Sequence, residues 1–517
     1  MFYSQFFNLF FSDAVLSLLD FFVDDSFKIG YTFLLYFVGR TLQNMTTSIQ
    51  FWDYSVWDFL VTLSVLFLAM LAANGLRRTI PFLKKSLIPS AVIGGFLVLI
   101  FAGIFKLITG NSPFSVVSVE SLTYHCLGLG IVAMSLQGSS KRSGKEARRD
   151  VFNSSLTTVS TYLVQALTGL IITVVLFFLI GSWAQSGILL PMGYGQGPGQ
   201  AFNWGTTYMN SYGFEHGSSF GLSVAACGFL AASIGGVIFL NVEAKKGLKR
   251  DADAEEKEDL SAVVITTRGE IPLSESLDKL TVQFALVFVS YAIGFGIMLG
   301  CSKLCDISGV GFLINTVKPL IWGFNFLFGM LASFLMRSYF KFGKKAGIVH
   351  RSYTNDFLLT RISGLMFDIM VVASIASIDL SAFRYPEFWL PLILITVAGG
   401  FVSFFYVRFI SRKFFKDYSS EQFLVMYGML TGTVSTGLIL LREIDPLYKT
   451  PAASNVVLQN LWSIILGAPM LLLLGVVAQS MQMTYITLAI LAVLLTAMLI
   501  LLYREQIFHK KKKAEKA

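Results

Sequence analysis

Residues 190–207 read Leu-Pro-Met-Gly-Tyr-Gly-Gln-Gly-Pro-Gly-Gln-Ala-Phe-Asn-Trp-Gly-Thr-Thr, an apolar stretch with glycine at four alternate positions, Gly193, Gly195, Gly197 and Gly199. In a continuous helix each glycine would cost about 1 kcal/mol relative to alanine, and an internal proline costs more. We therefore predict that the backbone is not helical here. The stretch is either a specialised site or a glycine-rich outer loop without a function.

The composition of the whole chain indicates a membrane protein. Of its 517 residues, 55% are hydrophobic and only 14% are charged, whereas soluble domains carry about 25% charged residues. Apolar runs of about 20 residues, enough to cross roughly 30 Å of hydrocarbon, recur from residue 59 to residue 503. An ordinary soluble enzyme and a singly anchored protein are therefore excluded. Because basic loops account for the net charge of +9, we expect no nucleic-acid partner.

Eleven apolar runs predict membrane-crossing helices, and the fold class should be all-helical. They are 59–75, 87–109, 119–137, 151–181, 217–240, 280–301, 309–336, 357–379, 387–410, 455–478 and 483–503. Lys and Arg favour cytoplasmic loops. This bias puts residues 141–149, 337–351 and 408–416 inside and leaves 110–118 and 479–482 outside. We expect a multi-pass protein of the plasma membrane with a cytoplasmic C-terminus.

A second interrupted stretch, residues 422–441, occupies the same place in the second half of the chain as residues 188–209 do in the first. It contains Thr431-Gly-Thr-Val-Ser-Thr-Gly437, whose hydroxyls bring hard oxygen ligands into a membrane without a charge. Small residues also serve helix packing, so the motif alone is weak evidence. The charge bias requires both stretches to enter and leave on one side. We therefore expect both to be re-entrant.

The two halves of the chain look alike, since each has four crossings, an interrupted stretch and a final crossing. An odd number of crossings precedes the linker between them, which predicts two inverted repeats of about five transmembrane helices each. We assign residues 58–240 and 280–478 to these repeats, and 241–279 to a charged cytoplasmic linker. Residues 479–517 add an extra transmembrane helix and a basic cytoplasmic tail. Residues 1–57, rich in aromatic and acidic side chains, predict interfacial helices or weak spans.

The interrupted stretches are the predicted binding site. Irregular backbone inside a membrane is tolerated only where protein or a water-filled cavity surrounds it. Exposed N–H groups and helix N-termini there attract carboxylates, while unwound carbonyls and hydroxyls hold Na⁺. We predict Na⁺, the coupling ion, near Gly195, Gly197, Thr431 and Thr433, with no other cofactor. The full candidate set for substrate and ion binding is Gly193, Gly195, Gln196, Gly197, Gly199, Asn203, Thr431, Gly432, Thr433, Ser435, Thr436 and Arg442.

Charges within the apolar runs are further candidates, because each costs about 2.5 to 3.5 kcal/mol at mid-membrane. Asp368 is the deepest and is a candidate for coupling, either as a proton carrier or by offsetting cation charge. The alternative is a structural ion pair with Arg361, seven residues away on the same helical face. Arg442 could hold a substrate carboxylate in a bidentate manner. It could equally serve as a positive-inside anchor.

Three places in the sequence resemble the sodium/glutamate symporter family. Gly193-Tyr-Gly-Gln-Gly197, followed by Tyr212-Gly-Phe-Glu215 and a small-residue run from Gly221, is similar to the family's first Gly-rich segment and the helix after it. Residues 361–380 look like its second-half span, which has small residues and a terminal acidic-or-polar Leu motif. Thr431 to Thr436 sits where the family has its second small and hydroxyl-rich segment.

The resemblance spans residues 59–478 and implies a secondary active transporter. Its members move glutamate with Na⁺ by alternating access; here we expect glutamate or a similar anionic amino acid, and a homodimer. Gln196 and Pro198 stand where the family commonly has His and Thr, which leaves the substrate open. The alternatives are a carrier of another small carboxylate, a proton-coupled carrier, a channel and a membrane-embedded enzyme. The last is opposed by the lack of His-Glu-x-x-His and Gly-x-Ser-x-Gly motifs.

Overall fold

The computed structural model describes residues 52, 54–137, 144–245, 278–311, 313–347, 351, 353–445 and 449–504. Nearly all of the predicted N-terminal interfacial segment, most of the linker 241–279 and the basic tail lie outside these residues. Contacts divide the chain into two units, residues 1–59 and 60–517. The packing described below is that of the second unit. Across the described residues the secondary structure is helical, with no strand.

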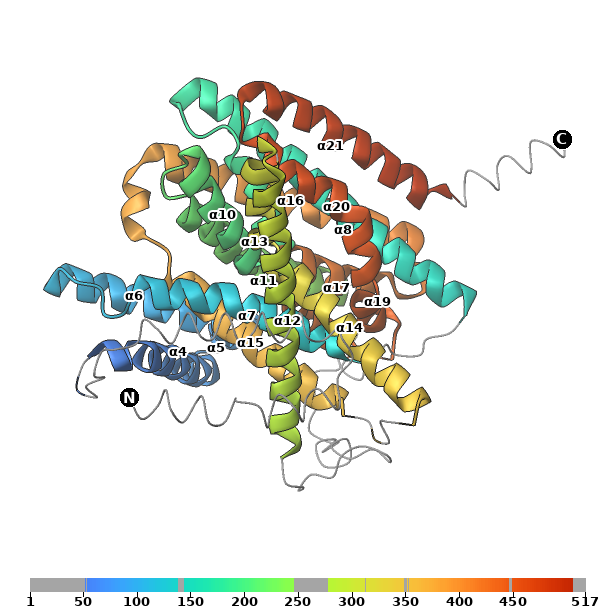
Figure 1. The fold of residues 1–517 in the computed structure, drawn as a ribbon. Helices are drawn as coiled ribbons and strands as arrows, with labels where there is room; N and C mark the ends of the chain where they lie inside the picture. Colours follow the sequence, from blue (N-terminus) through green and yellow to red (C-terminus); the bar gives the residue numbers. More distant parts are fainter. Residues whose placement is uncertain are drawn as a thin grey trace, which may run out of the picture. The chain divides into compact units, whose positions relative to one another are not determined.

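Nine helices in the described part of the chain are long and apolar enough to cross a membrane. They are α4 (Tyr54–Thr79), α6 (Ser90–Thr109), α7 (Val116–Leu136), α8 (Lys145–Ile180), α11 (Gly217–Ala244), α12 (Lys279–Ser308), α15 (Asp356–Ala376), α16 (Pro386–Phe414) and α21 (Met481–Leu502) (Figure 1). The prediction of an all-helical, multi-pass membrane protein is confirmed. Four short elements also connect the spans: α5 (Pro81–Lys85), η1 (Ser186–Ile188), η4 (Leu380–Arg384) and η5 (Lys416–Tyr418).

One of the eleven predicted crossings is an interrupted helix, and another is divided into two segments by a single residue. The run 309–336 forms a π-helical turn, η3 (Leu313–Val317), then α13 (Lys318–Gly323) and α14 (Asn325–Lys345). Phe324, with φ −108° and ψ 36°, breaks the helix between α13 and α14. The run 455–478 is divided into α19 (Ala452–Leu458) and α20 (Asn460–Val477). The run 309–336 is therefore not one continuous helix, whereas the run 455–478 keeps a helical backbone through Gln459, whose N–H donates to the Asn455 carbonyl over 2.9 Å.

Each Gly-rich stretch forms two short helices joined by a break. α9 (Leu189–Tyr194) and α10 (Pro198–Tyr212) flank Gly195–Gly197, which we call the first tip. α17 (Ser419–Thr431) and α18 (Val434–Arg442) flank Gly432–Thr433, the second tip. The predicted interruption of the first stretch is confirmed at the tip, whereas Gly193 and Gly199 lie within helices. Re-entrance into a membrane and the inverted repeats stay predictions.

The first hairpin, α9–α10, packs along the N-terminal part of α11. Gly205 lies against Gly217, and Ala201 lies against Gly221, one turn further along α11. Because the residue numbers fall along α10 as they rise along α11, the two helices are antiparallel. Small residues at these positions let the two backbones touch.

The second hairpin, α17–α18, packs along the C-terminal part of α11. The rings of Phe239 and Phe423 lie 4.3 Å apart between centroids, and the Tyr427 hydroxyl donates to the Ala231 carbonyl over 3.0 Å. Gly228, near the middle of α11, contacts the backbone carbonyl of Thr431. The two hairpins therefore approach Gly228 along α11 from its opposite ends.

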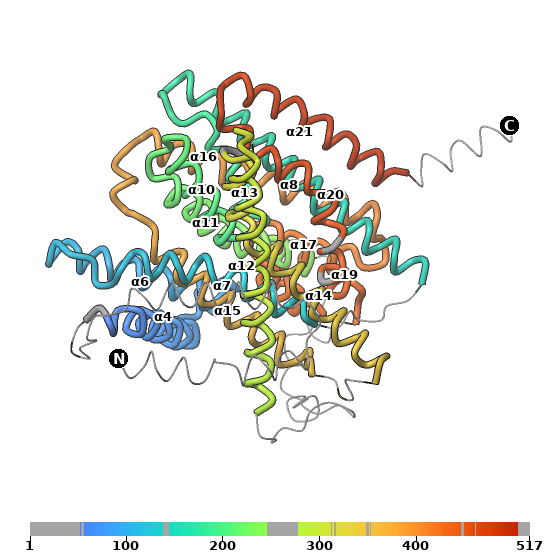
Figure 2. Tube along the Cα trace, viewed as in Figure 1, coloured from blue at the N-terminus to red at the C-terminus, as the bar shows by residue number. Residues whose placement is uncertain are grey.

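The remaining helices support this centre. α15 packs on α6 and α7, and α14 packs on α7 and α12. The extra C-terminal helix α21 lies against α8 and α20, as the tube trace shows (Figure 2). One polar contact on α21 is the bond from the Gln185 side-chain amide to the Thr484 hydroxyl, 3.0 Å long.

The turn between α15 and α16 is tied to the start of α11. The Asp379 carboxylate accepts a hydrogen bond from the Ser381 N–H (3.0 Å) and lies 3.5 Å from His216 Nδ1, while its own N–H donates to the Ser219 hydroxyl (3.0 Å). Burial acts to raise the pKa of Asp379. The hydrogen bonds from Ser381, together with the charges of Lys106 and His216, outweigh burial and hold that pKa below its usual value.

We expect Asp379→Asn to lower the thermal stability at pH 7 modestly, by less than about 1 kcal/mol because the carboxylate is partly exposed. A carboxyl group with a lowered folded-state pKa stabilises above its unfolded pKa, and this contribution is lost as the pH falls through the folded pKa. The difference in melting temperature should therefore shrink below about pH 4. A difference that stays constant from pH 3 to pH 7 would show that the charge is not its origin.

Candidate functional site

The two tips lie against each other. A Cβ atom at Gly197 would lie 3.7 Å from Cγ2 of Thr433 and 3.9 Å from the Gly432 carbonyl oxygen. At each tip one helix ends (α9, α17) and the next begins (α10, α18). The last carbonyls of a helix and its first N–H groups have no partner within the helix. The meeting point therefore offers acceptors for a cation and donors for an anion.

The first tip has a backbone conformation reserved for glycine. Gly197 adopts φ +86° and ψ 178°, a region that other residues enter only with strain. Gly195 is held from α8, because its carbonyl accepts a hydrogen bond of 2.9 Å from the Tyr162 hydroxyl. Gln196 is half-buried, and its N–H donates to the Pro191 carbonyl over 3.2 Å.

The second tip presents hydroxyl oxygens. Thr433 caps α18, because its Oγ1 accepts from the Thr436 N–H over 3.4 Å and lies 3.2 Å from the Thr436 hydroxyl. Buried Thr431 donates its hydroxyl hydrogen to the Tyr427 carbonyl over 2.7 Å, which leaves its oxygen available as an acceptor. Ser435 is exposed.

α8 contacts the first tip and the end of α17 that leads into the second tip. Three residues after Tyr162, the fully buried Gln165 donates through Nε2 to the Leu430 carbonyl and the Ser403 hydroxyl, each over 2.8 Å. Residues three apart lie on one helical face. Among the described residues, Gln165 Oε1 has no hydrogen-bond partner. One face of α8 thus binds Gly195 of the first tip and Leu430 of α17, two residues before the second tip.

The sequence reasoning missed Tyr162 and Gln165. A signal for them exists, because residues 153–165 of the apolar run 151–181 are rich in polar side chains: Asn153, Ser154, Ser155, Thr157, Thr158, Ser160, Thr161 and Gln165. All of these are buried. Polar residues in a membrane span face the protein interior, so this segment alone predicts an interior polar face.

The break between α13 and α14 adjoins the start of α10. Asn203 Nδ2 donates to the Gly323 carbonyl over 3.1 Å, and Gln200 Nε2 does so over 3.5 Å. Both side chains are buried, and within the described residues neither Asn203 Oδ1 nor Gln200 Oε1 has a partner. Asn203 is a sequence-predicted site residue, whereas Gln200 was missed. Their unpaired oxygens are acceptors for an ordered water or a cation.

Two predicted site glycines serve close packing rather than the tips. Gly193 in α9 lies against Val224 of α11, and Gly199 in α10 lies against Leu127 of α7. Neither position leaves room for a side chain. Both still support the site, because they set how closely the first hairpin docks.

The structure does not bring the two predicted charged residues to the tips. Arg442 ends α18 and is exposed, eight residues from Val434, the first residue after the second tip, or about 12 Å along the helix. Asp368 is exposed on α15, and it has no hydrogen bond or ion pair among the described residues. Arg361 packs over the Phe357 ring, 5.2 Å from its centroid, rather than against Asp368. The roles of Asp368 in coupling and of Arg442 as a substrate clamp stay predictions.

We expect Tyr162→Phe to slow uptake about fivefold, because a lost hydrogen bond worth about 1 kcal/mol leaves the Gly195 carbonyl less restrained. The measurement is the initial rate of substrate uptake. Tyr208→Phe is the matched control, since it removes a similar bond, from Tyr208 to the Leu474 carbonyl (2.8 Å), nearer the other end of α10. Equal losses of uptake in both variants would contradict a specific role for Tyr162 at the tip.

Comparison with known proteins supports the family resemblance. Residues 56–305 match the model of a family described as sodium/glutamate symporter, which is a family of transporters and not of enzymes. The match includes α8, the first tip and α11, and it ends before the second tip. No curated protein and no solved structure matches the chain.

Proposed function

We propose, on the premise that residues 56–305 match the sodium/glutamate symporter family, that the chain is a secondary active transporter. It carries glutamate, or a similar anionic amino acid, inward with Na⁺ by alternating access. The observation that supports this most is the contact between the first tip and the second tip. Broken membrane helices that meet in this way recur at the substrate and ion sites of secondary transporters.

At the tips, the N-terminal ends of the helices bind the anionic substrate and the C-terminal ends bind the cation. The first-turn N–H groups of α10 and α18 attract the substrate carboxylates, aided by the positive ends of the helix dipoles. Na⁺ takes oxygen ligands from the carbonyls at the ends of α9 and α17 and from the hydroxyl of Thr433. Gly195 keeps a second carbonyl lone pair for this role beside its bond from Tyr162. Because both ligands bind between the tips, each favours the other's binding, as symport requires.

The proposal includes a membrane arrangement. The two hairpins are re-entrant from opposite sides, and residues 58–240 and 280–478 are inverted repeats. Their approach to Gly228 from opposite ends of α11 supports this, as does the distribution of Lys and Arg among the loops. By the same charge bias the C-terminus is cytoplasmic, and we place the protein in the plasma membrane. We propose further that it works as a homodimer.

Competition for uptake into proteoliposomes tests the substrate class. Aspartate should inhibit the uptake of labelled glutamate, because it keeps both carboxylates and the ammonium group. Glutamine, which lacks the side-chain charge, should inhibit much less. If glutarate, which has no ammonium group, competes as well as aspartate, the protein is instead a carrier of small carboxylates.

Proton coupling through Asp368 is the second candidate, because Asp368 is an ionisable residue in the middle of a span. Under sodium coupling we expect Asp368→Asn to raise the Na⁺ concentration for half-maximal uptake, since a negative charge that favours the cation is lost. Loss of the pH dependence of uptake would support the proton-coupled alternative. An unchanged rate, pH profile and Na⁺ dependence would show that Asp368 has a structural role only.

A further inference from the structure

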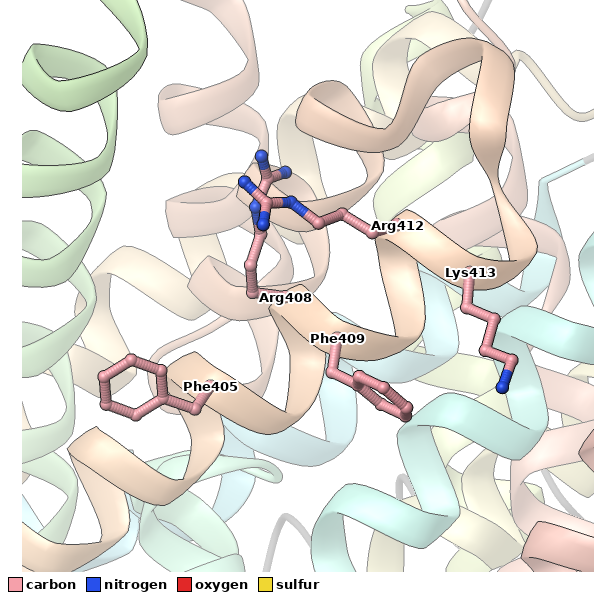
Figure 3. Close-up of a pocket in the computed structure, with 5 residues that line it drawn as sticks. All are labelled: Phe405, Arg408, Phe409, Arg412 and Lys413. Carbon is pink, nitrogen blue, oxygen red and sulfur yellow. The ribbon is translucent and has the colours of Figure 1, made fainter.

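A groove with a cavity volume of about 340 Å³ lies on α16, and no residue of either tip lines it. Its lining is Phe405, Arg408, Phe409, Arg412 and Lys413. Figure 3 shows these five side chains along successive turns of the one helix, with the guanidinium groups of Arg408 and Arg412 close together. The groove therefore combines phenyl rings with a cluster of positive charge.

The apolar part of the groove continues along the span. Phe401, Phe405 and Phe409 are four residues apart and so share one face of α16. Their exposed fractions are 63%, 66% and 54%. In a membrane span, such a stripe of exposed rings contacts lipid tails.

The basic part of the groove has more positive than negative charge. Arg408 donates to Glu243 over 3.1 Å, and Arg412 lies 3.7 Å from the same carboxylate. Lys413 Nζ lies 4.3 Å from the Tyr503 ring centroid. Two guanidinium groups thus share one carboxylate, and Lys413 adds a third positive charge beside them in the lining of the groove. Arg412 keeps 58% of its side chain exposed, so its guanidinium group is accessible to an anion from outside.

We propose that this groove binds an anionic phospholipid, with the headgroup phosphate at Arg412 and Lys413 and an acyl chain along the three phenyl rings. The basic cluster lies near the C-terminal end of α16, which the charge bias assigns to the cytoplasmic leaflet, where anionic lipids attract juxtamembrane Lys and Arg. A soluble phosphate would leave the phenyl rings uncovered. A second copy seated symmetrically on the groove would place like charges against each other.

Lipid retention by the purified full-length chain tests the proposal. The protein is equilibrated in micelles containing equal phosphatidylglycerol and phosphatidylcholine, and bound lipids are counted by native mass spectrometry. We expect the wild type to bind more phosphatidylglycerol than phosphatidylcholine. In the double variant Arg412→Gln/Lys413→Gln the ratio of the two bound lipids should fall about fivefold for each charge removed. The matched control is Lys344→Gln/Lys345→Gln, which removes two charges from the last turn of α14 and should retain the preference.

Three results would overturn the proposal. Equal losses in the test and control variants would mean that the preference reflects overall charge and not the groove. Displacement of phosphatidylglycerol by excess inorganic phosphate would identify a site for free anions. Disulfide-linked dimers of Phe405→Cys, absent from the wild type under the same oxidation, would show that a second copy covers the groove.

Discussion

Gly197→Ala is expected to abolish glutamate uptake while the chain still inserts and folds. With φ +86° and ψ 178°, Gly197 occupies a region in which alanine is strained by about 1 to 3 kcal/mol. Steric overlap is not the cause, because the nearest atom to an added Cβ is 3.7 Å away. The tip can relieve the strain only by changing its backbone, which moves the first N–H groups of α10.

The measurement is the initial uptake rate in proteoliposomes, with expression and melting temperature followed in parallel. Gly296→Ala is the control, because Gly296 lies within helix α12 and an added Cβ there meets nothing within 4 Å. Alanine at Gly296 should leave uptake unchanged. Wild-type uptake by Gly197→Ala would remove the first tip from the site.

Gly228→Ala is expected to separate the two tips and so to stop uptake. A Cβ at Gly228 would collide with the backbone carbonyl oxygen of Thr431 and lie 2.9 Å from Cδ1 of Tyr194. A backbone carbonyl has little freedom to move aside, so α17 must shift away from α11. Overpacking of this kind costs about 1 to 3 kcal/mol, and we expect a lower melting temperature together with the loss of uptake.

Gly400→Ala is the matched control for Gly228→Ala. A Cβ at Gly400, on α16, would make ordinary contacts, 3.5 Å from Cβ of Ala231 and 3.9 Å from the Tyr194 hydroxyl oxygen. It therefore adds a methyl group near the same α11 surface without a collision. Normal uptake by Gly228→Ala, or a similar loss in Gly400→Ala, would contradict the importance of the contact between α11 and the second hairpin.

The four alternate glycines allowed us to predict the place of the break in the first stretch. They did not allow us to predict its length. α9 ends before Gly195 and α10 begins after Gly197, whereas Gly193 and Gly199 are helical and pack against Val224 and Leu127. Helix propensity is the same for all four glycines, so it does not tell which of them lie in the break. The four glycines differ in their tertiary surroundings, which the local conformational preferences of the sequence do not contain.

The break in the run 309–336 was missed for a similar reason. That run is apolar enough to read as one crossing, yet it separates into α13 and α14 at Phe324. The Gly323 carbonyl at this break is satisfied by Asn203 and Gln200 of α10. Side chains more than a hundred residues away in the sequence thus supply the hydrogen bond that the Gly323 carbonyl lacks within the helix.

The sequence identified charged residues within the apolar runs, but it did not show whether they lie at the binding site. Asp368 and Arg442 stand out in the sequence because charges in apolar runs are costly, but neither contacts the tips in the described structure. The groups that bind the first tip and the end of α17, Tyr162 and Gln165, are uncharged and lie in the apolar span of α8. The mean hydropathy of the whole span does not reveal these two residues, whereas the polar side chains of residues 153–165 would have indicated them.

Uptake of labelled glutamate into proteoliposomes, measured with and without an inward Na⁺ gradient, tests the central proposal most directly. With the gradient, glutamate is expected to reach an internal concentration above the external one. This accumulation should disappear when K⁺ replaces Na⁺ or when an ionophore dissipates the gradient. Glutamate that only equilibrates across the membrane, at a rate indifferent to Na⁺, would contradict sodium-coupled symport.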